Sequence, residues 1–85
     1  MNDVTKELEA TVYLQPANKI IIVSTNFAVN DYTINAMIGK LPLMIKNVRG
    51  LSLFTIDVTT LKSGIHVLTL TGIQNEKHEV FFAKS

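Results

Sequence analysis

Serine, histidine and aspartate side chains, which together can form a hydrolytic triad, occur in the second half of this 85-residue sequence. Ser52 or Ser63, His66 or His78, and Asp57 would supply the members. A triad nucleophile needs a strained turn and an oxyanion hole, and the sequence has no G-x-S-x-G segment or comparable turn. We interpret Asp57 as the solvent-facing residue of an alternating strand, where its carboxylate can bond a turn. The protein is therefore predicted not to be an enzyme, with no catalytic residues.

A second group of residues has the types that bind a divalent metal. His66 and His78 are the two histidines, and Glu76 and Glu79 would lie near them if the last two strands pair. Imidazole and carboxylate groups are common ligands of zinc. An amphipathic strand position accounts for His66, and a turn and a strand start account for the two glutamates. We predict no metal site and no cofactor.

Other binding chemistry is sparse in the sequence. The absence of cysteine excludes disulfides and thiolate metal sites. The four glycines stand singly, so the sequence contains no glycine-rich loop for a phosphate. There is no tryptophan, and the six tyrosines and phenylalanines are about what a small core uses. A carbohydrate-binding accessory domain is kept as an alternative.

The charge and hydropathy of the sequence argue against nucleic-acid-binding proteins and against proteins with a transmembrane helix. The net charge is +1 and the eight basic residues are scattered, so we expect no nucleic-acid partner. The longest apolar run, Ile20 to Val23, is far shorter than the roughly 20 residues of a transmembrane helix. Acidic residues in the first ten positions do not suit a signal peptide. For an exported protein, we expect the export signal to lie upstream of this segment.

The chain divides into a short leader and one domain. Residues 1–10 carry three acids and one lysine without a strand pattern, which predicts a solvated leader or linker. From residue 11 to residue 85, β-branched and aromatic runs alternate with turn residues, as in all-β proteins. The predicted strands are Thr11–Leu14, Lys19–Thr25, Asp31–Ile38, Leu43–Asn47, Leu53–Val58, Ile65–Thr71 and Lys77–Ala83.

The predicted turns include Asn26 to Asn30 and Arg49-Gly50. Residues 32–38 and 54–58 alternate between apolar and polar, which indicates strands with one solvated face. Residues 20–23 and 65–70 are apolar at successive positions, which is typical of strands covered on both faces. We predict a seven-stranded antiparallel immunoglobulin-like β-sandwich, with a small barrel as the alternative.

Four segments follow one another in the order YLQPANKIIIV, INAMIGK, IDVTTLKSGIHVLTL and HEVFFAKS. Together they resemble the C-terminal sorting domain of the type IX secretion system, over about residues 12 to 85. The motif positions are Tyr13, Pro16, Ala17, Ile22, Ile34, Gly39, Lys40, Ile56, Asp57, Leu61, Gly64, Ile65 and Lys84. Gly64 can adopt the positive φ that a β-carbon would obstruct, and Leu61 can pack beneath the same turn.

The chain departs from the family pattern at three places. Leu14-Gln15-Pro16 replaces Pro-Asn-Pro, Asn35-Ala36 replaces an aromatic residue followed by aspartate, and His66 replaces tyrosine.

The resemblance implies a non-catalytic signal at the extreme C-terminus of a cargo protein. Such cargo passes from the periplasm through the outer membrane to the cell surface. The implied partners are the type IX translocon and a sortase-like protease, which removes the domain and joins the cargo to anionic lipopolysaccharide. Some relatives retain the domain and bind another envelope protein, and a retained binding or signalling module is the alternative.

The terminal segment Val80, Phe81, Phe82, Ala83 and Lys84 is the predicted recognition surface. An edge strand offers backbone groups for β-augmentation. Phe81 and Phe82 should point to opposite faces, so one is expected in the core and the other is available to a partner. Lys84 also suits a gatekeeper that prevents edge-to-edge pairing. A free edge would equally allow homodimers.

Overall fold

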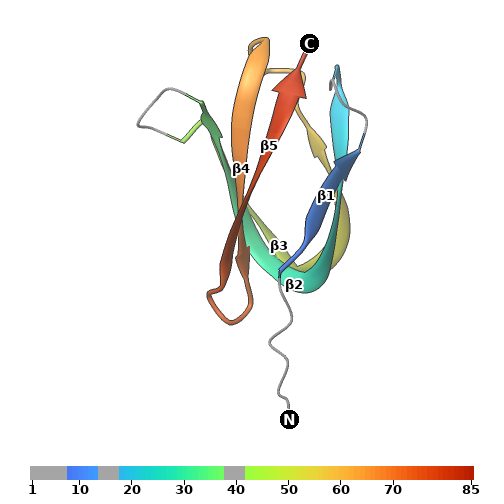
Figure 1. Cartoon of the computed structure of the whole chain (residues 1–85), viewed down its shortest axis with the longest axis vertical. Helices are drawn as coiled ribbons and strands as arrows, with labels where there is room; N and C mark the ends of the chain where they lie inside the picture. The colour runs from blue at the N-terminus through green and yellow to red at the C-terminus, as the bar shows by residue number, and fades with distance from the viewer. Residues whose placement is uncertain (1–7, 14–17, 38–41) are drawn as a thin grey trace.

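The computed structural model describes residues 8–13, 18–37 and 42–85, and all regular elements in these ranges are β-strands (Figure 1). Within these ranges, no helix is long and apolar enough to cross a membrane. The five described strands are β1 (Ala10–Tyr13), β2 (Ile20–Ala36), β3 (Met44–Asp57), β4 (Gly64–Gly72) and β5 (Lys77–Lys84). The prediction of an all-β fold is confirmed.

The predicted number of seven strands is wrong, because two pairs of predicted strands are continuous. β2 joins the second and third predicted strands, and β3 joins the fourth and fifth. The residues predicted as turns between them lie at irregularities inside the strands, where the β2–β3 register shifts between Ser24 and Val29 and again between Val29 and Asp31. Arg49 and Gly50 have φ angles of 56° and 87°. Positive φ at a β-bulge bends a strand without ending it.

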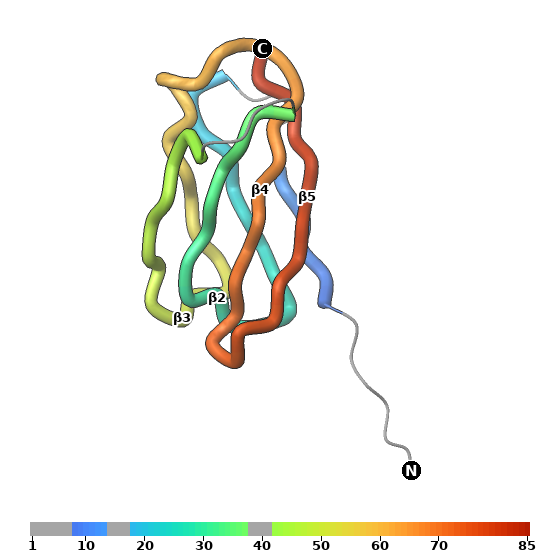
Figure 2. The backbone as a smooth tube through the Cα atoms, turned by 90° about the vertical axis from the view of Figure 1, so that its left-hand side faces the viewer, coloured from blue at the N-terminus to red at the C-terminus, as the bar shows by residue number. Residues whose placement is uncertain are grey.

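The strands form one antiparallel sheet in the order β1-β2-β4-β5, with β3 also paired to β2. The first half of β2 pairs with β1 and the end of β3, whereas its second half pairs with the start of β3 and with β4. Because both long strands bend, the sheet curls (Figures 1 and 2). The curl brings β1 into contact with β5, from the opposite end of the strand order.

The core lies inside the curl and receives side chains from all five described strands. Tyr32 of β2 stacks on Phe54 of β3 with ring centroids 5.8 Å apart, and burial raises the pKa of the Tyr32 hydroxyl. The other buried apolar residues are Val12, Ile21, Val23, Val29, Ile34, Ile56, Val58, Leu61, Leu68, Leu70 and Phe82. The predicted alternation of residues 54–58 is confirmed, since Phe54, Ile56 and Val58 are buried while their neighbours are exposed.

The prediction that residues 20–23 and 65–70 are covered on both faces is wrong. Ile21 and Val23 are buried, but Ile20 is 41% exposed, and Ile65 at the start of β4 is 47% exposed. The curled sheet has one inner face, so alternate side chains of these strands lie on its outer surface. Those outward residues contribute to the candidate site.

Candidate functional site

The terminal strand β5 places its two phenylalanines on opposite faces, as predicted. Phe82 is 1% exposed and stacks on the ring of His66, with centroids 5.5 Å apart. Phe81 is 51% exposed. Val80 and Ala83 are half-buried. Phe82 therefore belongs to the core, and Phe81 is the available aromatic side chain.

An apolar surface surrounds Phe81 on the outer face of the sheet. Val67 lies opposite Phe81 in the β4–β5 register, and Ile65 lies two residues before Val67 on the same face. The backbone N–H of Met37, which is 58% exposed, donates to the carbonyl oxygen of Ile65 at 3.2 Å. We name Met37, Ile65, Val67 and Phe81 the outer apolar patch. The recognition surface predicted from the sequence did not include Met37, Ile65 and Val67. For Ile65 and Val67, the alternation of apolar and polar residues on both sides of His66 indicates that these two side chains share one face of β4.

The edges of the sheet give less support to recognition through the backbone of β5. β5 ends the strand order, but β1 contacts it. Lys84 is half-buried, and its Nζ donates to the Ser85 carbonyl oxygen at 3.3 Å. Among the described strands, β3 is paired on one side, with β2. The exposed side chains of β4 and β5 are therefore a better contact surface than the edge of β5.

The segment from Asp57 to Gly64 forms a tightly bonded turn between β3 and β4. Oδ1 of Asp57 accepts hydrogen bonds from the backbone nitrogen of Thr59 at 2.9 Å and from its hydroxyl at 2.5 Å. These two bonds, with a smaller contribution from the charge of Lys46, lower the pKa of the Asp57 carboxyl. The N–H of Leu61 donates to the carbonyl oxygen of Val58 at 3.0 Å. The prediction that Asp57 is solvent-facing and bonds a turn is confirmed.

The two motif residues that follow also behave as predicted. Leu61 is 7% exposed and packs in the core cluster. Gly64 has a φ of 130°, and no heavy atom lies within 4 Å of the position that a β-carbon would occupy. Tyr13 is 49% exposed on β1. The motif residues Pro16, Ala17, Gly39 and Lys40 lie outside the described residues.

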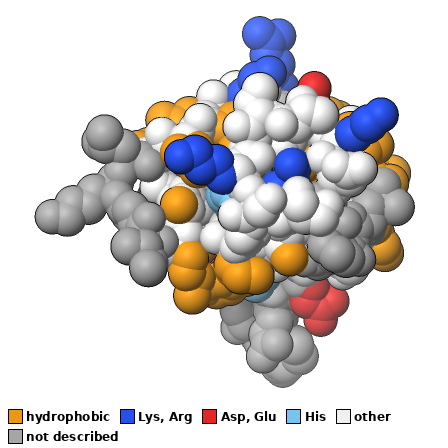
Figure 3. All heavy atoms as spheres, turned by 90° about the horizontal axis from the view of Figure 1, so that it is seen from above, with side chains coloured by type: hydrophobic (Ala, Val, Ile, Leu, Met, Phe, Trp, Pro, Cys, Tyr) orange, Lys and Arg blue, Asp and Glu red, His pale blue; other side chains and the backbone are white. Residues whose placement is uncertain are grey.

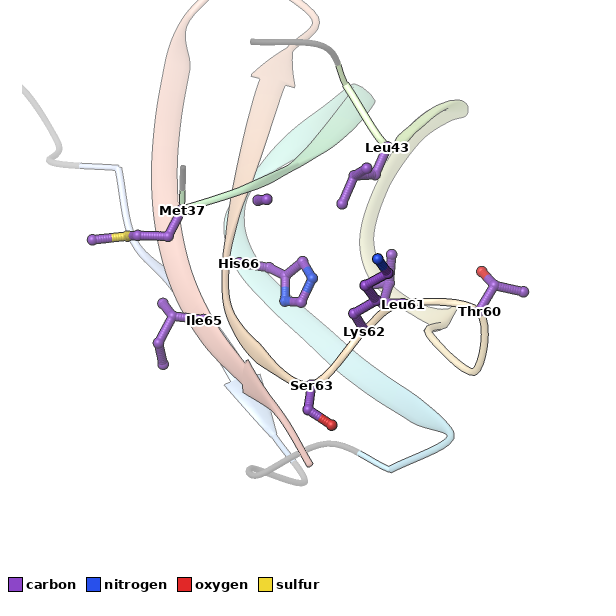
Figure 4. Close-up of a pocket in the computed structure, with 9 residues that line it drawn as sticks. Met37, Leu43, Thr60, Leu61, Lys62, Ser63, Ile65 and His66 are labelled. Carbon is purple, nitrogen blue, oxygen red and sulfur yellow. The ribbon is translucent and has the colours of Figure 1, made fainter. Parts of the chain in front are cut away.

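A pocket of about 570 Å³ lies where β4 begins (Figure 4). It is lined by Ala36, Met37, Leu43, Thr60, Leu61, Lys62, Ser63, Ile65 and His66. His66 is 3% exposed, and its Nδ1 lies 3.2 Å from the carbonyl oxygen of Gly64. Figure 4 shows its ring projecting toward Leu61 and Lys62, whereas Met37 and Ile65 point the other way. No local sequence pattern predicts this pocket, because its lining residues come from two separate parts of the chain.

The structure separates the two histidines considered from the sequence, whereas Ser63 and His66 of the candidate triad line the same pocket. His66 lies opposite Phe82 and His78 lies opposite Leu70, so the histidines are about 13 Å apart along the strands. His78 packs edge-on against Phe27 at 6.3 Å. The Asp57 carboxylate is bonded to Thr59, and in the described ranges no three histidine or acidic residues are grouped to hold a metal.

Seen from above, the surface shows apolar side chains gathered along one side, with lysine and arginine side chains standing apart from one another (Figure 3). On this face, the described residues thus form an apolar area without a basic cluster. Comparison with known proteins adds no relative, because no protein-family model, curated protein or solved structure matches this chain.

Proposed function

We propose that this protein is a non-catalytic signal domain that directs an attached cargo protein through the outer membrane by the type IX secretion system. The observation that supports this most is the β3–β4 turn. Its sequence, IDVTTLKSGIHVLTL, is the longest segment that resembles the sorting family. In it, Leu61 packs in the core and Gly64 has a φ of 130°. Both features fit the structural role that the motif spacing predicts.

We also propose that the curled sheet is a strongly bent form of the predicted immunoglobulin-like sandwich. The bends divide β2 and β3 into halves, so that seven straight segments result. One layer would hold β1, the first half of β2 and the end of β3, while the other would hold the start of β3, the second half of β2, β4 and β5. The pairing of β2 with different strands along its length supports this arrangement. A folded sandwich would present a fixed surface to a translocon.

The proposed contact surface is the outer apolar patch. Contiguous exposed apolar side chains often mark protein interaction sites, and aromatic residues often contribute most to binding. Phe81 is the aromatic member of this patch and is 51% exposed. It belongs to the terminal strand β5, in which Val80 to Lys84 form the predicted recognition surface for the translocon. A translocon component would cover Phe81 together with Ile65 and Val67.

A surface-display assay tests the proposed function. Residues 1–85 are fused to the C-terminus of a periplasm-targeted fluorescent cargo in a bacterium with the type IX system, and in a strain that lacks the translocon. We expect protease-accessible cargo only where the translocon is present. Loss of the 9.4 kDa domain would indicate cleavage by the sortase-like protease, and an unchanged size would indicate a sorted and retained domain. Cargo trapped in the periplasm of both strains would contradict the proposal.

A retained module that binds another envelope protein is the second candidate. The departure at His66 favours it, because this histidine is buried against Phe82 where the family pattern has tyrosine. A detergent-free pull-down from envelope extract distinguishes the two functions. Recovery of translocon components alone would contradict the retained module, whereas recovery of a different envelope protein by wild type and not by Phe81→Ser would support it.

A further inference from the structure

The pocket at the start of β4 has the size and lining of a small-molecule site. Its volume of about 570 Å³ lies within the roughly 300–1,000 Å³ range of such sites. Leu61 and His66 are its buried residues, and the apolar side chain of Leu43 also lines it. In Figure 4, Leu43 and Leu61 lie on the side to which the His66 ring projects. The pocket therefore combines apolar walls with one buried polar ring.

The hydrogen bonding of His66 defines what this ring can offer. Nδ1 lies 3.2 Å from the carbonyl oxygen of Gly64, and a carbonyl oxygen can only accept. Nδ1 therefore carries the proton in the neutral ring, and Nε2 carries a lone pair. In the part of the chain that the structure describes, no hydrogen bond reaches Nε2. A hydroxyl or N–H group of a molecule in the pocket can therefore donate to Nε2.

We propose that this pocket binds a small neutral molecule with an apolar body and one hydroxyl group, such as a phenol. The hydroxyl donates to Nε2 of His66, and its oxygen can accept from the ammonium group of Lys62, which also lines the pocket. The apolar body contacts Leu43 and Leu61. Met37 and Ile65 line the pocket and also belong to the outer apolar patch, but their side chains point away from the His66 ring (Figure 4), and Phe81 does not line the pocket. The proposed binding to His66 therefore does not depend on the proposed sorting function.

Three probes with the same ring and different head groups test the proposal. The full chain is titrated with p-cresol, toluene and 4-methylbenzoate, and binding is followed by the ¹⁵N shift of His66 Nε2 and the methyl shifts of Leu61. We expect p-cresol to bind about threefold to tenfold more tightly than toluene, which is the effect of one hydrogen bond. 4-Methylbenzoate should also bind more weakly than p-cresol, because its carboxylate cannot donate to Nε2.

A matched pair of variants assigns the preference to His66. His66→Phe keeps a ring against Phe82 but lacks Nε2, and it should bind p-cresol and toluene equally. His78→Phe changes the other histidine, which does not line the pocket, and it should retain the preference. If His66→Phe fails to fold, the change in the ¹⁵N shift of wild-type His66 Nε2 on addition of p-cresol tests whether the hydroxyl bonds to Nε2. Equal affinities for p-cresol and toluene, an unmoved Nε2 resonance or tighter binding of 4-methylbenzoate would each overturn the proposal.

Discussion

At the scale of single residues, the turn between β3 and β4 combines three physical effects in a short segment. Asp57 accepts two hydrogen bonds from Thr59, Leu61 removes apolar surface from water, and Gly64 adopts a backbone conformation that other residues disfavour. The three effects are separable because the carboxylate is exposed, the leucine is buried and the glycine has open space around it. Each can therefore be tested by a substitution at one position.

Substitution of Gly64 tests the backbone effect. Gly64→Val should lower the free energy of unfolding by about 1–3 kcal/mol, because valine is strained at a φ of 130°. Since no heavy atom lies within 4 Å of the new β-carbon, its loss of stability would come mainly from the backbone. Urea denaturation measures the change. Ser63→Val introduces the same side chain at an exposed neighbour with an unstrained φ and should stay within about 0.5 kcal/mol of wild type. Equal stability of Gly64→Val and wild type would refute this explanation.

Asp57 should make stability depend on pH. Its folded-state pKa is lowered, first by the hydroxyl and then by the backbone N–H of Thr59. Its contribution is therefore present above the unfolded pKa of about 3.8 and is lost as pH falls through the lowered folded value. Asp57→Ala should have a lower Tm than wild type at pH 7, and the difference should shrink below pH 3.8.

Calorimetric scans from pH 2 to pH 7 measure this difference in Tm. Glu79→Ala is the control, because Glu79 is an exposed carboxylate on β5, away from the turn. It should leave the profile of the wild type nearly unchanged. A Tm difference for Asp57→Ala that stays constant down to pH 2 would show that the carboxylate charge has no part in capping the turn.

At the scale of elements, β5 has one face in the core and one exposed face. Phe82 lies inside the curl and Phe81 lies on the outer apolar patch. This division follows from strand alternation, so it could be predicted from the sequence alone. Which phenylalanine lies in the core could not, because both are apolar and the choice depends on the register with β4, where Phe82 meets His66.

The two phenylalanines should therefore respond differently to substitution. Phe82→Ala should lower the free energy of unfolding by about 3–5 kcal/mol because it removes a buried ring. Phe81→Ser should change stability by about 0.5 kcal/mol or less but reduce translocon-dependent surface display of the fused cargo. Denaturation and the display assay measure these effects. Full display of the Phe81→Ser fusion would exclude Phe81 as a recognition residue.

The two long strands β2 and β3 contain residues with the composition of turns, and here the local sequence does not predict whether a strand ends or continues. Asn26 to Asn30 and Arg49-Gly50 have the composition of turns, and positive φ is indeed present at Arg49 and Gly50. The same residues also suit a bulge inside a strand. Only the partner strand distinguishes the two cases, since β3 remains paired with β2 on both sides of the irregularity. The sequence thus predicted the strand segments well and their continuity poorly.

At the scale of the whole molecule, the pocket depends on the curl of the sheet. Its lining residues come from two separate parts of the sequence, namely the end of β2 with Leu43, and the turn before β4 with the start of β4. No local pattern can predict such a meeting of segments. His66 could be placed on a strand from its neighbours, but its polar ring acquires a binding role only when the curl places Leu43 and Leu61 around it.

The edges of the sheet predict the oligomeric state. Among the described strands that pair on one side only, β3 is the longest, but it bends at Arg49-Gly50 and carries the exposed charges of Lys46 and Arg49. Bends and charges of this kind oppose strand pairing between copies. We expect sedimentation to give a 9.4 kDa monomer at micromolar concentrations. A mass that doubles with concentration would instead support the homodimer that a free edge permits.

The directions of β1 and β5 also determine how a mechanical load acts on the molecule. Figure 1 shows both strands running in the same direction, so that β1 begins at one end of the curl and β5 finishes at the other. A load applied between Ala10 and Lys84 is therefore directed along the strands. The load then acts in shear on the hydrogen bonds between β4 and β5. These hydrogen bonds resist it together, instead of breaking one at a time. A domain pulled by its C-terminus with cargo attached behind it would resist extension in this geometry.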